Sequence, residues 1–158
     1  MFRLLAAVLA AAVPATAQAA PQKYLCDFTG HDTPRKVDDG GFISEKYLLE
    51  IDAGNSTATA YDALAHSVDG APVTAKFTRK RDGQYRLRWK LAQVPVIVTK
   101  TVDYGIPDII ETTFTMRYSV LFDPEAMQGI LSASGAGERF TSSAKLVCQK
   151  TNKSLAFR

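Results

Sequence analysis

Apolar and polar residues alternate with a period of two along most of the chain after Pro21. Such alternation, broken at short intervals by turn residues, is typical of antiparallel β-strands with one buried face. The pattern predicts an all-β fold of about eight strands with no long helix. The apolar stretches cover residues 24–28, 47–51, 57–61, 73–91, 94–102, 109–122, 130–134 and 144–149.

The stretch 73–91 is the best-defined predicted hairpin, because both of its arms alternate cleanly. A two-residue turn at Asp82 and Gly83 would place the apolar side chains of the two arms on opposite faces. A three-residue turn that ends with Gly83 in the left-handed conformation instead pairs Phe77 with Leu87. This second register keeps the apolar side chains together, and we predict it.

The N-terminal segment has the pattern of a secretory signal peptide, with Arg3 ahead of an apolar run and small residues behind it. Pro14 ends the run well short of the roughly 20 apolar residues that a transmembrane helix needs. Cleavage after Ala19 satisfies the preference for small residues at the cleavage site. We therefore expect no transmembrane anchor, and we predict three segments: a signal peptide over 1–19, a β domain over 20–149 and a flexible basic tail over 150–158.

The two cysteines of the chain lie near the ends of the predicted domain, at Cys26 and Cys148. In an exported protein such a pair predicts a disulfide. A disulfide requires Cα atoms within roughly 7 Å, so the first and last strands are expected to be neighbours or to face each other across the core. A chain of successive strands joined end to end in this way favours a closed up-and-down, lipocalin-like barrel over a β-sandwich.

Three parts of the chain resemble uncharacterised small exported β-rich proteins of α-proteobacteria: Cys26-Asp27-Phe28, the run Arg86 to Leu91, and the run Tyr118 to Pro124. The shared residues are core aromatics and turn residues. The resemblance covers most of the predicted domain and implies a bacterial host, an exported location and a β fold. It implies no activity.

The predicted register of the 73–91 hairpin gathers cations on the outward face of its two arms. With 19 basic and 16 acidic residues, the whole chain has a net charge of only +3, so this face is a local feature. Like charges directly opposite each other in a strand pair are unfavourable, and such a face favours an anion. Glu50 or Glu111 of neighbouring strands, or water, could supply the compensation instead. The candidate anion-binding residues are Lys76, Lys80, Arg86, Arg88 and Lys90.

The inward face of the barrel is a second candidate site, since an eight-stranded barrel either holds one small ligand or is filled by side chains. Large side chains of this kind are usually core. The candidate lining residues for a small apolar ligand are Phe77, Trp89, Phe114, Met116 and Tyr118.

No motif of catalytic residues is recognisable. The chain has only two histidines, His31 and His66, and none of its serines lies in a Gly-x-Ser-x-Gly turn. The acidic residues near His31 have the spacing of neither a zinc site nor a calcium loop. We therefore expect no catalytic residues, no metal and no cofactor.

These observations predict a non-enzymatic binding module of the periplasm or the extracellular medium. Its expected ligand is a small apolar molecule in the barrel interior or an anionic envelope component on the basic face. The export signal and the near-neutral charge argue against nucleic acid. The alternatives are a protein-protein interaction or inhibitor-type module that binds an acidic partner, and a hydrolase of a kind without a recognisable motif.

Overall fold

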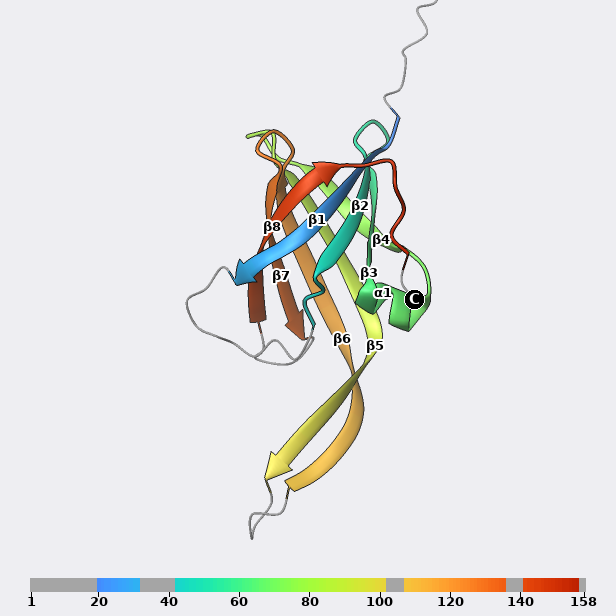
Figure 1. Ribbon diagram of the computed structural model, residues 1–158, viewed down its shortest axis with the longest axis vertical. Helices are drawn as coiled ribbons and strands as arrows, with labels where there is room; N and C mark the ends of the chain where they lie inside the picture. Colours follow the sequence, from blue (N-terminus) through green and yellow to red (C-terminus); the bar gives the residue numbers. More distant parts are fainter. Residues whose placement is uncertain (1–19, 32–41, 102–106, 136–140, 157–158) are drawn as a thin grey trace, which may run out of the picture.

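The computed structural model describes residues 20–31, 42–101, 107–135 and 141–156 (Figure 1). The predicted signal peptide, 1–19, lies outside the described residues. One short helix and eight strands follow one another in this order: β1 (Gln22–His31), β2 (Lys46–Asp52), β3 (Thr57–Asp62), α1 (Ala63–Asp69), β4 (Val73–Arg79), β5 (Tyr85–Thr101), β6 (Pro107–Asp123), β7 (Gln128–Gly135) and β8 (Thr141–Lys150).

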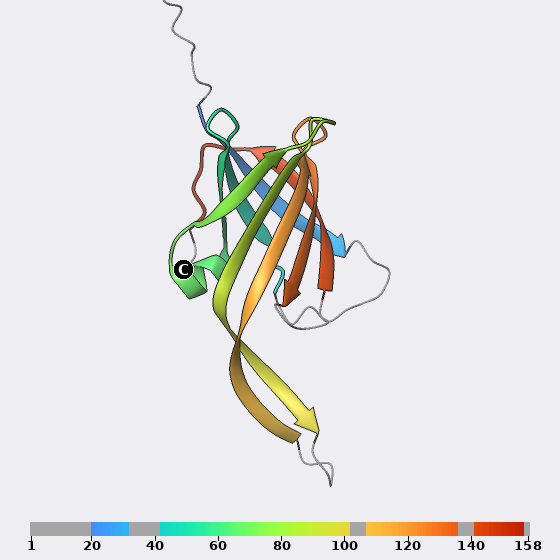
Figure 2. The same ribbon diagram turned by 180° about the vertical axis from the view of Figure 1, so that it is seen from behind.

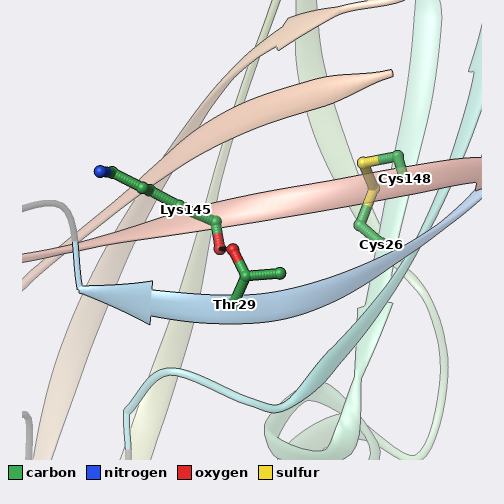
Figure 3. The surroundings of a disulfide bond; sticks show 4 residues. All are labelled: Cys26, Thr29, Lys145 and Cys148. Atoms are coloured by element: carbon green, nitrogen blue, oxygen red, sulfur yellow. Dashed lines mark hydrogen bonds between the residues drawn. A yellow bond between two sulfur atoms is a disulfide. The ribbon is translucent and has the colours of Figure 1, made fainter. Parts of the chain in front are cut away.

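The eight strands form a closed antiparallel barrel in which each strand pairs with its neighbours in the sequence and β8 pairs with β1 (Figures 1 and 2). The prediction of a closed barrel is confirmed, and the sandwich alternative is wrong. The physical reason is the pairing of β1 with β8, which we call the seam of the barrel. Cys26 and Cys148 are directly opposite each other in this ladder. Their Cα atoms are 3.9 Å apart. Figure 3 shows the bond between their sulfur atoms. The disulfide therefore joins two hydrogen-bonded strands and does not cross the core.

Inward-facing residues from every strand form one core, because the period-two pattern of the sequence matches the pleat. The ring of Trp89 stacks on that of Tyr118, with centroids 5.2 Å apart, and Tyr24 meets Phe122 edge to face at 4.8 Å. The largest fully buried side chains are Tyr24, Tyr47, Tyr118, Phe122, Leu49, Leu87, Leu91, Met116, Leu131, Leu146, Val94 and Val120.

The β4–β5 hairpin has the predicted register, with Phe77 opposite Leu87 and Lys76 opposite Arg88. Gly83 has a φ of 85°, the left-handed conformation that the three-residue turn requires. Lys80 closes the turn, and its amide donates to the carbonyl of Gln84 at 2.8 Å. The alternation of the two arms was therefore sufficient to select the turn.

Strand β5 differs from the prediction, which placed separate strands at 85–91 and 94–102. The structure has one strand with an irregularity between Leu91 and Val94, where Gln93 has a φ of 56°. Pro95 looked like a strand break because it has no amide proton for a ladder. It lies beyond the four-residue ladder that joins β4 to β5, so the missing proton costs no hydrogen bond on that edge.

Helix α1 lies in the stretch between β3 and β4 that lacked a regular pattern. The carboxylate of Asp62 caps the helix by accepting from the amide of Ala65 at 2.8 Å, and Gly70 ends it in the left-handed conformation. The same carboxylate accepts from the hydroxyl of Ser44 at 2.7 Å. Because Asp62 is only 2% exposed, desolvation raises the pKa of its carboxyl above the usual value.

At the C-terminus of the barrel, Lys150 is the last residue of β8, and the amide of Thr151 donates to the carbonyl of Lys23 at 3.0 Å. Within the described residues, no helix has the length and apolar character needed to cross a bilayer.

Candidate anion-binding face

Cations of three adjacent strands lie side by side on the outside of the barrel. Alternation along β4, β5 and β6 directs every second side chain outward, and the ladders then place Lys76 opposite Arg88 and Lys90 opposite Arg117. All four of these side chains are exposed. We call them the basic face: Lys76, Arg88, Lys90 and Arg117. Each cross-strand pair brings together two positive charges, an arrangement that is unfavourable without an anion.

The described part of the chain supplies no carboxylate to the basic face. Its ion pairs join Lys23 to Glu50 at 3.5 Å, Lys46 to Asp27 at 2.9 Å, and Lys80 to Asp82 at 3.6 Å; none of them includes a residue of the basic face. Glu50 and Glu111 were the acids that could have compensated these charges. Glu50 is on β2 beside Lys23, and Glu111 lies opposite Ile97, six residues before Arg117 on β6. Among the described residues, no carboxylate therefore balances these positive charges.

A hollow of about 360 Å³ lies within the basic face. Its lining consists of the four cations together with Trp89 and Tyr118. The rings of these two residues stack inside the barrel, so the floor of the hollow is held by the core. A small anionic group in this hollow would be surrounded by positive charge from three strands.

A row of hydroxyl groups continues from the basic face around the barrel. Arg88 is opposite Ser119, which is opposite Ser132, which is in turn opposite Ser143. The hydroxyls of Ser132 and Ser143 lie 3.3 Å apart and form a hydrogen bond. Hydroxyl donors beside cations suit a ligand that carries several oxygen acceptors, such as a phosphorylated head group.

The structure divides the predicted anion-binding residues into two groups. Lys76, Arg88 and Lys90 lie in the basic face. Arg86 is exposed two residues before Arg88 on β5, opposite Leu121, and Lys80 belongs to the turn, where it pairs with Asp82. Arg117 was missed, because the sequence analysis did not align the stretch 109–122 with the strand that carries Arg88 and Lys90. The signal that could have found it is the register of the β5–β6 pair.

The interior of the barrel is packed where the predicted cavity-lining residues lie. Trp89, Met116 and Tyr118 are at most 4% exposed, and the hydroxyl of Tyr118 donates to the carbonyl of Phe42 at 2.9 Å. Phe77 is half-buried and meets Tyr85 edge to face at 5.2 Å. Phe114 is half-buried where β6 leaves the barrel. Trp89 also stacks on Tyr118, so the described aromatic contacts of these residues are with other aromatic side chains.

The groups that could have supported catalysis have other contacts. Ser44 is buried and donates to Asp62, a pair that no imidazole joins within the described residues. The side chain of His66 lies against Tyr61, with its Nδ1 atom 2.8 Å from the Tyr61 hydroxyl. Where the structure describes the chain, no three His, Cys, Asp or Glu side chains are grouped closely enough to hold a metal ion.

Cys26 and Cys148 form a disulfide. Such bonds persist in oxidising compartments outside the cytoplasm. No protein-family model, no curated protein and no solved structure matches the chain.

Proposed function

We propose that this chain is a non-enzymatic binding module of the bacterial periplasm or the extracellular medium, and that its basic face holds the phosphate groups of an anionic envelope lipid. The observation that carries the proposal is the pair of cation-cation neighbours, Lys76 with Arg88 and Lys90 with Arg117, without a carboxylate partner among the described residues. The signal peptide pattern and the disulfide support an exported location.

The basic face supports a surface ligand better than the interior supports a small apolar one. The core side chains that would have to move aside, Trp89 and Tyr118, are stacked on each other. Opening a cavity there would forfeit that contact and the packing around it. An anion on the outer face instead relieves repulsion between exposed charges and requires no change in the barrel.

Binding to lipid vesicles tests this proposal. Each Lys or Arg near an anionic membrane surface contributes about 1 kcal/mol, so replacing Lys76, Arg88 and Arg117 together by Ser is expected to weaken binding by about 100-fold. The comparison uses vesicles with an anionic phospholipid and purely zwitterionic vesicles. The unmodified protein should bind the former, release them as salt rises, and ignore the latter.

The matched control replaces Arg81, Lys150 and Lys153 by Ser. This variant removes the same net charge from exposed positions outside the basic face. It should retain most of the vesicle binding. If both triple variants lose binding equally, the attraction depends on net charge alone and the proposed face is wrong. If the unmodified protein binds neither vesicle type at low salt, the proposal of a lipid ligand is wrong as well.

A further inference from the structure

Strands β5 and β6 continue beyond the barrel as a two-stranded arm. The β6–β7 ladder begins at Met116 and the β4–β5 ladder ends at Arg88, whereas β5 and β6 stay paired as far as Thr101 and Pro107. Figures 1 and 2 show this arm as a twisted ribbon that projects from one end of the barrel. An isolated two-stranded hairpin is only marginally stable in water, so the arm lacks the support that the barrel strands give one another.

Both faces of the arm expose large aliphatic side chains. The register places Ile97 opposite Glu111, and Ile109 is two residues from Glu111 on the same face. Ile97 is 69% exposed and Ile109 is 66% exposed; Ile110, on the other face, is 43% exposed. Strands that are apolar on both faces are typical of sheets covered on both sides. Nothing in the described part of this chain covers the arm.

The remaining exposed large aliphatic residues of the described chain, Ile130 and Val147, lie together in a groove on the outside of β6, β7 and β8. The groove has a volume of about 530 Å³, and Leu121 and Lys145 also line it. The hydroxyl of Thr29 donates to the carbonyl of Lys145, and Figure 3 shows the Lys145 side chain extending away from the disulfide. The exposed aliphatic surface is thus divided between the arm and this groove.

The arm and the groove carry the same pattern with opposite charge. On the arm, Glu111 lies opposite Ile97 and two residues from Ile109. In the groove, Lys145 lies opposite Ile130 and two residues from Val147. The carboxylate of Asp123 also lines the groove, where it accepts from the amides of Glu125 and Ala126 in its own turn. Each site therefore has two aliphatic side chains and one charge in equivalent positions of a strand pair. Glu111 is exposed and takes part in none of the ion pairs of the described residues.

The two sites cannot meet within one molecule. Strand β6 runs from the arm to the turn at Asp123, and the groove lies beside that turn. At about 3.3 Å per residue, Ile109 and Leu121 are roughly 40 Å apart along this strand. Hydrocarbon is a poor alternative environment for the arm, because both ribbon edges carry unpaired backbone groups and Glu111 carries a charge.

We infer that the arm of one copy of this chain lies in the groove of a second copy, with Ile97 and Ile109 against Ile130 and Val147, and with Glu111 paired with Lys145. The contact covers Ile97 and Ile109 on one face of the arm, covers Ile130 and Val147 in the groove, and gives Glu111 an opposite charge. It uses none of the residues of the basic face, so it is independent of the proposed function.

Charge reversal tests this contact through the concentration dependence of molar mass in analytical ultracentrifugation. The unmodified protein should associate as its concentration rises. Glu111→Lys and Lys145→Glu should each weaken association about tenfold or more, because each places like charges together. The double variant restores an opposite pair in reversed order and should associate within about threefold of the unmodified protein. Lys150→Glu, a reversal at an exposed position of β8 outside the groove, is the matched control and should change little.

Thermal melts of every variant show whether it is folded. A protein that remains monomeric at millimolar concentration contradicts the inference, and so does a double variant that fails to recover association. An Ile97→Ser variant distinguishes self-association from insertion of the arm into lipid. If the unmodified protein is monomeric and this substitution abolishes binding to vesicles, the arm enters lipid and self-association is wrong.

Discussion

Strands β5 and β6 each pass through two regions, the barrel and the arm. The alternating sequence is common to both regions, but they differ in burial and in strand pairing. Inside the barrel, Leu87 and Val120 are fully buried, and β5 and β6 each have a partner on both edges at these positions. In the arm, the same alternation exposes Ile97 and Ile109, because β5 and β6 are paired only with each other there. Alternation thus specifies a strand and its two faces, whereas burial depends on whether other strands lie alongside. The strands of the barrel are therefore paired within one chain, whereas the exposed side chains of the arm are covered by a second copy in the contact that we infer.

The largest effect is expected at the seam that completes the barrel. The bond between Cys26 and Cys148 closes a loop with a sequence separation of 122 residues. In the chain-entropy model a loop of that size stabilises the folded state by about 5 kcal/mol. Reduction should therefore lower the melting temperature by about ten degrees or more. A melt with and without reductant measures this, and the Cys26→Ser, Cys148→Ser double variant should match the reduced protein. A melting temperature that reduction leaves unchanged would show that the seam needs no covalent bond.

A pair of substitutions on one strand makes the comparison between barrel and arm directly. Leu91→Ala removes a fully buried side chain and should lower the free energy of unfolding by about 2 to 5 kcal/mol. Ile97→Ala, in the arm, should change it by less than about 0.5 kcal/mol in dilute monomeric protein. Denaturant unfolding at low concentration measures both values. Similar losses for the two variants would mean that the arm is part of the barrel's cooperative unit.

The smallest of these effects concerns Asp62 at the end of β3. Desolvation raises the pKa of its carboxyl in the folded state above the ordinary value of 3.8, so the folded protein binds that proton more tightly than the unfolded chain. The contribution of Asp62 to stability is therefore greatest in acid and falls as pH rises above 3.8, levelling off above the folded pKa. Asp62→Asn retains a helix-capping oxygen but cannot titrate.

Unfolding curves of Asp62→Asn and of the unmodified protein between pH 4 and pH 7 test the sign of this effect. The unmodified protein should lose stability relative to the variant as pH rises. A constant difference across this range would mean that the carboxyl has an ordinary pKa, and a change in the opposite direction would mean that its hydrogen bonds outweigh desolvation.

The sequence predicted the parts of the fold that depend on local pattern and on the cysteine pair. Gly83 and the alternating arms were enough for the register of the β4–β5 hairpin, and Cys26 with Cys148 favoured a barrel in which the first and last strands meet, as the structure shows. The arm was not predicted, since Pro95 marks a strand break when only one strand is considered. Whether Pro95 lies on a free edge depends on where β4 ends, and nothing in the residues of β5 shows this.

The candidate site was likewise predicted where it depends on one hairpin and missed where it depends on the pairing of further strands. Lys76 and Arg88 were found together because they share one hairpin, whereas Lys90 and Arg117 come together through the β5–β6 register, which the sequence analysis did not derive. The groove residues Ile130 and Val147 belong to strands that were predicted, but their exposure became evident only when the barrel showed which face points outward.

Hydrogen exchange of the unmodified protein at two concentrations tests most directly whether the barrel is complete alone and the arm depends on a second copy. At low concentration, the amides of β6 from Met116 to Phe122 should be protected, while those from Ile109 to Phe114 should exchange quickly. At high concentration the arm amides should become protected, together with those around Ile130 and Val147, and the barrel amides should stay unchanged. Arm amides that are equally protected at both concentrations, or equally unprotected, would contradict the account.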